Sequence, residues 1–325
     1  MIARIAQMYH VENQRQADIA KQLRMSQATV SRMLKRAQEE EIVRTTVISP
    51  SGTYADLETE LRQMYELDEV IVVECSEDSD GPIMARIGEA AAHFVEATLQ
   101  PDEVIGVSSW SETILKMVDN IHPMKSGKAK RVVQTLGGMG DPTVQIHANQ
   151  LTTRLAKLTG AEAHLLSAPG VAQSREAKLI LVSDTYVRET IDLFSNITLS
   201  IIGIGAVEPS SMLARSGNVF TSRELADAEE AGSVGEISLR FFDGDGQPVK
   251  TPMDDRVIGM NLERLSTIDR VMALAGGKSK VAAIKGALRT GVIDLLVTDK
   301  FTAERLLAPA DPSTQERKQY VQICK

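Results

Sequence analysis

Short, largely apolar runs alternate with longer segments of helical periodicity through most of this chain. The runs cover Val70–Val73, Val104–Val107, Val132–Leu136, Ile197–Ile202, Val271–Ala275 and Val292–Val297. Helical patterns fill much of the space between them, over about 84–99, 111–122 and 145–159, then up to Arg289 and briefly after Asp299. Continuous apolar strands separated by helices are typical of a parallel sheet that is covered on both faces. The pattern therefore predicts an α/β fold from residue 68 onward.

The first part of the chain has a different pattern. Residues 1–45 are helical in character, Thr45–Ile48 is β-branched, and Ser49–Gly52 is rich in turn residues. A helix is predicted from Tyr54 to Leu67, because Leu57, Leu61 and Met64 fall on one helical face. This helix either contacts a second chain or packs on its own domain. We therefore divide the chain into residues 1–52, a linker helix 53–67, and a larger domain 68–325.

A helix-turn-helix pattern lies within the first domain. Gln16–Leu23 is a short amphipathic helix, Arg24 and Met25 form a tight connector, and the Ser26 hydroxyl can cap a second helix. The layout has two helices, a short turn and a second helix with a free N-terminal half, as in DNA-reading motifs. Ile42–Val47 would then form a wing strand. These features predict a small, mainly α-helical winged helix-turn-helix domain.

Two details depart from the usual pattern. Arg24 stands where a glycine is common, although a non-glycine residue at positive φ is disfavoured. Arg15 stands where a Ser or Thr cap is common, and Asn13 is the alternative cap.

The exposed face of the second helix carries side chains that suit a major groove. Gln can bridge adenine, Arg can bridge guanine, and Ala or Thr can touch the thymine methyl group. Lys21, Arg36 and Arg44 could contact phosphates, which would fix register without reading sequence. An ordinary helical hairpin with a charged face is the alternative. The candidate DNA-binding residues are Gln27, Ala28, Thr29, Ser31, Arg32, Lys35 and Arg36.

The charge distribution favours the DNA-binding interpretation. The chain has 325 residues and a net charge of −8. Residues 1–50 hold eight Lys or Arg and five Asp or Glu, which gives +3 and leaves −11 for the remainder. A basic head on an acidic body suggests a polyanion-binding module joined to a second domain, although a solvated helix surface would also be basic.

Composition excludes several other classes of protein. Hydrophobic residues make up 43% and charged residues 25%, as in globular proteins rather than disordered ones. No apolar run approaches the roughly 18–20 residues that cross a bilayer, and the N-terminus lacks a signal-peptide pattern, so we expect a cytoplasmic protein with no membrane partner. Two cysteines and five scattered histidines give neither a disulfide scaffold nor metal-ligand spacing, and no metal is expected.

Loops that follow predicted strands are the candidate ligand site. Open α/β sheets bind ligands at the carboxyl ends of their strands. Ser108–Thr113 follows one strand and precedes a helix, which suits an anion, but Ser109 or Ser111 could simply cap that helix. Trp110 could stack on a sugar or merely pack. Gly137–Gly140 follows the next strand and permits close approach of a ligand, although a tight turn would also need glycines.

Polar residues farther along the chain extend this hypothesis. Gln145 and Asn149 share one helix face, where they could bind hydroxyl groups or simply be solvated. Glu236 lies before a predicted strand and is either a hydroxyl acceptor or a surface carboxylate. Lys280 follows a Gly-Gly pair and is either a phosphate ligand or a solvated lysine.

Two other motifs each lack a residue that a dinucleotide or calcium site requires. Gly203-Ile204-Gly205 lacks the third glycine of a dinucleotide fingerprint, so no NAD or other cofactor is expected. Asp243–Gly246 lacks the later Glu of a calcium loop and is interpreted as a hairpin turn.

Taken in order, these motifs resemble a known family. The runs 16–23, 26–37 and Glu41–Arg44 are similar to the N-terminus of the SorC family of bacterial sugar-responsive transcription regulators. The resemblance continues through 106–113, 136–140 with 147–149, 203–205, 235–237 with 241–243, and 275–280. It implies a Rossmann-like effector domain related in fold to sugar-phosphate isomerases and deaminases, and a homotetramer. The effector-binding residues implied are Ser108, Ser109, Trp110, Ser111, Thr113, Gly137, Gly138, Met139, Gln145, Asn149, Gly205, Glu236 and Lys280.

These observations predict a transcription regulator rather than an enzyme. Its partners would be operator DNA and a sugar, polyol or sugar-phosphate effector. One alternative is a sugar-phosphate isomerase or deaminase with a DNA-binding head, but no convincing acid and base pair stands out in the sequence. Another is a sugar-binding module whose head mediates protein contacts only.

Overall fold

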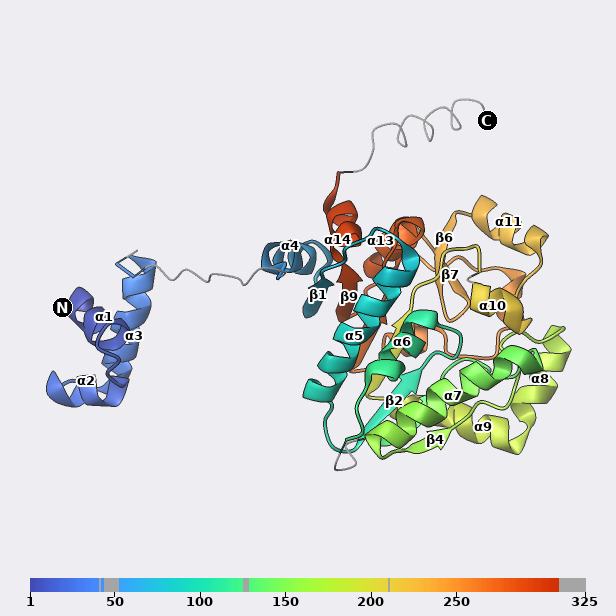
Figure 1. The fold of residues 1–325 in the computed structure, drawn as a ribbon, viewed down its shortest axis with the longest axis horizontal. Coiled ribbons are helices and arrows are strands. Elements are labelled where there is room, and N and C mark those ends of the chain that lie inside the picture. Colours follow the sequence, from blue (N-terminus) through green and yellow to red (C-terminus); the bar gives the residue numbers. More distant parts are fainter. Residues whose placement is uncertain (41, 44–52, 125–128, 210, 310–325) are drawn as a thin grey trace. The chain divides into compact units, whose positions relative to one another are not determined.

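The structure, a computed structural model, describes the chain except for residues 41, 44–52, 125–128, 210 and 310–325. It contains two compact units, Met1–Pro50 and Ser51–Lys325 (Figure 1). Most of the expected wing strand and the polar C-terminal segment lie outside the described residues.

The N-terminal unit is a three-helix cluster. It contains α1 (Ile2–His10), α2 (Gln16–Gln22) and α3 (Gln27–Glu39). Apolar residues at helical spacing meet in one core, in which Ile5, Ile19 and Val30 are fully buried. This burial explains why three short helices are stable together, since helices of this length are marginal alone.

The turn between α2 and α3 has the tight geometry that the sequence suggested. Arg24 adopts a left-handed conformation with φ 50°, despite its side chain. The Ser26 hydroxyl accepts a hydrogen bond from the Thr29 amide at 3.1 Å and caps α3, as predicted. The expectation that Asn13 caps α2 is wrong: Arg15 is the N-cap residue and makes no side-chain cap bond.

The C-terminal unit is built on a seven-stranded sheet in which all neighbouring strands are parallel. The strand order is β1-β9-β8-β5-β2-β3-β4. The strands are β1 (Glu69–Val73), β2 (Glu103–Val107), β3 (Ala129–Gln134), β4 (Glu162–His164), β5 (Leu199–Gly203), β8 (Arg270–Leu274) and β9 (Leu295–Asp299). All six predicted strands are present, with ends displaced by at most three residues, and the short polar strand β4 was not predicted.

Both faces of the sheet are buried, because successive side chains point to opposite sides. Ile105, Met272 and Val297 face a core beneath α5 (Asp80–Thr98), α6 (Glu112–Asn120) and α7 (Pro142–Thr159). Val104 and Val271 face the opposite core, which includes residues of α13 (Val281–Arg289) and α14 (Lys300–Leu307). The fold is therefore the covered α/β architecture that the apolar runs predicted.

The remaining elements surround the sheet. They are α8 (Arg175–Ser183), α9 (Thr185–Asp192), α10 (Ser211–Ser216), α11 (Ser222–Glu230), α12 (Leu262–Leu265), the antiparallel hairpin β6 (Ser233–Ile237) and β7 (Arg240–Asp243), and 3-10 turns at Leu193–Asn196, Pro252–Asp255 and Lys278–Lys280. After β7 the chain makes a hairpin turn, in which the Asp243 carboxylate accepts hydrogen bonds from the amides of Asp245 and Gln247.

The predicted linker helix is part of the C-terminal unit and packs on its own domain. α4 (Ala55–Tyr65) contacts β1 and α14, and Leu61 is fully buried there. The Glu58 carboxylate accepts a 2.9 Å hydrogen bond from the Val72 amide. At the start of the helix, Tyr54 donates to Glu74, which also pairs with Lys300.

The path of the chain fixes where a ligand can bind. From β2 the chain moves outward through β3 to β4, and from β5 it moves the other way through β8 to β9. The order therefore reverses between the neighbouring strands β2 and β5. Loops that leave the carboxyl ends of two such strands diverge and leave a crevice between them.

Candidate functional site

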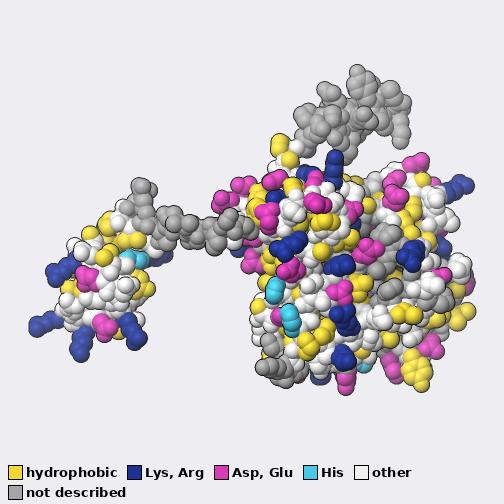
Figure 2. Space-filling view, viewed as in Figure 1, with side chains coloured by type: hydrophobic (Ala, Val, Ile, Leu, Met, Phe, Trp, Pro, Cys, Tyr) yellow, Lys and Arg dark blue, Asp and Glu magenta, His cyan; other side chains and the backbone are white. Residues whose placement is uncertain are grey.

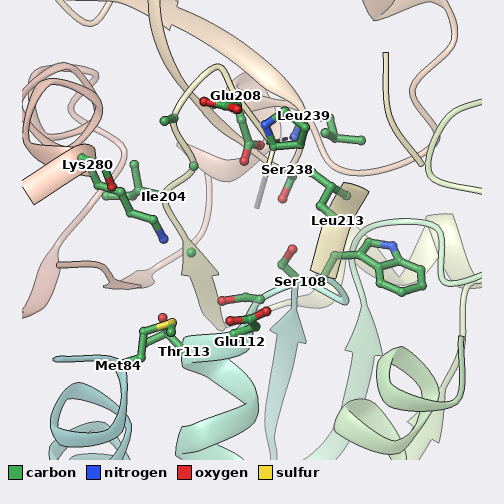
Figure 3. A pocket seen from close by; sticks show the side chains of 18 of the residues that line it. Met84, Ser108, Glu112, Thr113, Ile204, Glu208, Leu213, Ser238, Leu239 and Lys280 are labelled. Carbon is green, nitrogen blue, oxygen red and sulfur yellow. Dashed lines mark hydrogen bonds between the residues drawn. The ribbon is translucent and has the colours of Figure 1, made fainter. Parts of the chain in front are cut away.

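A cavity of about 370 Å³ lies at this crevice (Figure 3). Its volume falls in the range of roughly 300–1,000 Å³ that small-molecule sites occupy. The loops after β2, β5 and β8 contribute to it, together with the starts of α5 and α6 and the hairpin β6–β7. The lining residues are Asp80, Met84, Ser108, Trp110, Ser111, Glu112, Thr113, Leu136, Gly203, Ile204, Gly205, Ala206, Glu208, Pro209, Leu213, Glu236, Ser238, Leu239, Gly276, Ser279 and Lys280.

Three serines after β2 have different roles. The Ser111 hydroxyl caps α6 by accepting a hydrogen bond from the Ile114 amide at 3.3 Å, and it also lines the cavity. Ser109 is fully buried and donates a 2.7 Å hydrogen bond to the Leu136 carbonyl. It therefore joins the loop after β2 to the loop after β3. Ser108 lines the cavity directly (Figure 3).

Trp110 forms part of the cavity wall while its indole is packed in a core. The side chain is only 5% exposed and packs in the same core as Leu136 and Phe241. Its indole N–H donates a 2.9 Å hydrogen bond to the Gly137 carbonyl. The polar end of the indole is therefore already bonded within the protein, and packing explains most of its surface.

Glu236 enters the cavity from the hairpin. It lies within β6, not before a strand as the sequence suggested. Its carboxylate accepts a 2.6 Å hydrogen bond from the Leu239 amide, and its backbone exchanges two hydrogen bonds with Gly205. Burial raises the pKa of the Glu236 carboxyl, while the Leu239 amide and the Lys280 ammonium lower it.

Gly205 is required by this arrangement. A β-carbon placed there would overlap Glu236 Oε1, so only glycine permits the carboxyl group to lie against that strand end.

Some sequence-predicted residues lie outside the cavity lining. A β-carbon at Gly137 would meet the Pro169 carbonyl, so this glycine permits close packing of two backbone segments. Gln145 accepts a 3.3 Å hydrogen bond from the Gly140 amide. Ser109, Gly137, Gly138, Met139, Gln145 and Asn149 are not among the lining residues.

A second candidate site is the outer face of α3 in the N-terminal unit. Val30, Leu34 and Ala37 are buried, so Gln27, Ser31 and Arg32 are left on the exposed face. The exposed cations farther along the helix form ion pairs one turn later, Lys35 with Glu39 and Arg36 with Glu40. Lys and Arg side chains are prominent on this unit in Figure 2.

Comparison with known proteins identifies the family. Residues 49–308 match a family described as "Putative sugar-binding domain". The erythritol catabolism regulatory protein EryD of Brucella abortus is 31% identical, over 94% of this chain and 95% of its own. The full-length sorbitol operon regulator SorC of Klebsiella pneumoniae superimposes with a TM-score of 0.72 at 27% identity, covering 94% of this chain and 98% of its own. This chain belongs to the SorC family of transcriptional regulators.

A further solved structure extends the likeness of the C-terminal unit. A domain described as the "Putative sugar-binding domain of transcriptional regulator DeoR" from Pseudomonas syringae pv. tomato is 41% identical, with a TM-score of 0.63, covering 79% of this chain and all of its own. The matches of EryD and SorC over 94% of the chain confirm the SorC-family resemblance that the ordered motifs indicated.

The cavity brings together seven of the predicted effector residues: Ser108, Trp110, Ser111, Thr113, Gly205, Glu236 and Lys280. The sequence analysis did not select Asp80 or Glu208, although Glu208 lies in the loop after β5, as Gly205 does. It also passed over Glu112, which lies inside the loop that it selected.

Neither a metal cluster nor a membrane span is found in the part of the chain that the structure describes. No group of three or more His, Cys, Asp or Glu side chains there is arranged to hold a metal ion. No described helix is both long and apolar enough to cross a bilayer.

Proposed function

We propose that this SorC-family chain is a DNA-binding regulator of a carbohydrate catabolic operon, controlled by a sugar, polyol or sugar phosphate bound in the cavity. The observation that carries the proposal is the position of the cavity. It lies where the strand order reverses, and serine, threonine and carboxylate side chains from separate loops converge on it. Those groups are suited to hydrogen bonding with hydroxyls.

The N-terminal unit supplies the DNA-binding half of the proposal. The exposed face of α3 carries Gln27, Ser31 and Arg32, which can form hydrogen bonds with base edges in a major groove. In this proposal the protein works in the cytoplasm, where DNA and catabolic intermediates are both present.

Regulation would act through an oligomer. We propose a homotetramer, in which the effector stabilises one arrangement of the C-terminal units. Because paired DNA half-sites must match the spacing of the heads, a change in that arrangement changes operator affinity. Light scattering of the purified protein measures the oligomeric state, and a monomer would contradict this part of the proposal.

We also propose that the cavity senses its ligand without converting it. EryD and SorC, the relatives named above, are both described as regulators. EryD is named for erythritol catabolism and SorC for the sorbitol operon. Turnover of ribose 5-phosphate or glucosamine 6-phosphate by the purified protein would contradict this part.

The test of the whole proposal is fluorescence anisotropy of the full-length protein on DNA from its own upstream region. Salt-sensitive, sequence-selective binding that shifts with a pool of sugars and sugar phosphates is the expected result. DNA binding that no member of the pool changes would contradict the sensing function. Absence of DNA binding in every condition would leave α2 and α3 as a structural hairpin.

Arg32→Ala is expected to weaken binding to the operator by about 1–3 kcal/mol and to relax discrimination against random DNA, if Arg32 reads a base. Anisotropy titrations on operator and random duplexes measure both effects. The matched control is Lys21→Ala, which removes an exposed cation on α2. If Lys21 binds a phosphate, its removal should weaken binding to all sequences about equally. Equal losses of affinity on both duplexes for Arg32→Ala would remove Arg32 from base reading.

A further inference from the structure

The cavity is acidic, which bears on the chemical class of its ligand. Four carboxyl groups line it, those of Asp80, Glu112, Glu208 and Glu236. They come from the start of α5, the start of α6, the loop after β5 and strand β6. Among the described residues that line the cavity, Lys280 is the sole cation. Glu112, Glu208 and Lys280 lie around the same space in Figure 3.

The single ammonium group shares the cavity with the Glu236 carboxyl. Both residues line the cavity, and the positive charge of Lys280 lowers the pKa of the Glu236 carboxyl. An anionic ligand would have to share Lys280 with Glu236. It would also meet the partly buried Glu112 nearby, with the exposed Asp80 and Glu208 at the rim.

The positive end of α6 is likewise compensated before any ligand arrives. Ser111 accepts the Ile114 amide, and Glu112 places a carboxylate in the first turn of the helix. Negative charge at this position stabilises the helix and reduces the attraction that its N-terminus would offer a phosphate.

We infer that the effector is an uncharged polyhydroxylated compound, an aldose, ketose or alditol, rather than a phosphate ester. Hydroxyl groups donate to carboxylates in charge-assisted hydrogen bonds, and a neutral ligand meets no like charge. The apolar lining residues Ile204, Leu213 and Leu239 can pack against its C–H surfaces. This inference rests on the proposed function and narrows its ligand.

The test compares matched pairs by calorimetry on the full-length protein. The panel holds neutral four- to six-carbon alditols, aldoses and ketoses, together with the monophosphate ester of each. At least one neutral compound is expected to bind at least tenfold more tightly than its own ester. A panel in which an ester binds better than its parent, or in which no neutral compound binds, overturns the inference.

Charge-neutralising variants test the cause. Glu112→Gln with Glu208→Gln is expected to raise the affinity for phosphate esters relative to their neutral parents by about tenfold, because two like charges are removed. Glu229→Gln with Glu230→Gln removes the same two charges from exposed positions at the end of α11, outside the lining, and should leave the ratio unchanged. An unchanged ratio in the double variant contradicts the charge argument.

Failure of the proposed function gives a different result. The same titrations are repeated with upstream DNA present. A ligand of either class that binds without changing DNA affinity would contradict the sensing function and leave the ligand class decided by calorimetry. An ester that binds and shifts DNA affinity would support the function and overturn only the inference of a neutral ligand.

Discussion

Phe242→Ala is expected to lower the free energy of unfolding of the C-terminal unit by about 3–5 kcal/mol, as large-to-small changes of buried aromatic residues do. Phe242 on β7 is fully buried. Its ring approaches the backbone of α13 at Gly286, where a β-carbon would lie 3.1 Å from it. Alanine would leave a void between the hairpin and α13, two elements that the Arg289 side chain also joins through its hydrogen bond to the Gly244 carbonyl.

Urea denaturation followed by circular dichroism measures this loss of stability. Tyr186→Ala is the matched control, because the Tyr186 ring is 76% exposed and its removal creates no cavity. Phe242→Leu should lie between the two, since leucine refills part of the void. A loss below about 1 kcal/mol for Phe242→Ala would mean that the hairpin does not pack on α13 as described.

Glu236→Gln is expected to weaken effector binding by about 1.5–3 kcal/mol, or roughly 10- to 150-fold, the contribution of a hydrogen bond to a charged group. The amide oxygen of glutamine can still accept from the Leu239 amide, so the hairpin should keep its fold. The variant removes the negative acceptor for a ligand hydroxyl. Calorimetry with the effector found in the panel measures the change, with Glu230→Gln as the control.

The same residue should make binding depend on pH. Burial raises the pKa of Glu236 above its ordinary value of 4.5, so the carboxyl becomes protonated at a milder pH than an exposed glutamate. The ionised carboxylate accepts hydrogen bonds from ligand hydroxyls more strongly than the protonated acid does. The affinity for the effector should therefore rise as pH increases through the raised pKa of Glu236. In Glu236→Gln this component of the pH dependence should be absent. If Glu236→Gln keeps the full pH dependence of the unmodified protein, the pH dependence arises from another titrating group.

The fold was predictable where burial leaves a clear pattern. Strands such as β2 and β9 are covered on both faces, so they form nearly continuous apolar runs that stand out from the helices. Strand β4 was missed because Glu162–His164 is short and polar at the edge of the sheet. The apolar run Leu179–Val182 lies in α8, where Leu179 and Ile180 are largely exposed.

The candidate site was predictable only in part, for a related reason. Ser108 and Gly205 closely follow β2 and β5, and the reversal of strand order brings the ends of those strands together. Gly137 also follows a strand, but its backbone packs against Pro169, a contact between distant segments that local sequence does not reveal. The backbone pairing of Glu236 with Gly205 is likewise a tertiary contact. It joins the separate hairpin β6–β7 to the loop after β5.

Trp110 is the one tryptophan in the chain, and it lies in the wall of the cavity with its indole N–H held by Gly137. The tryptophan emission of the whole protein therefore originates beside the ligand site and nowhere else. A ligand that enters the cavity changes the polarity around that indole, so the emission maximum or intensity should follow occupancy without any attached dye. Stopped-flow mixing could then time effector entry separately from DNA release in the same sample.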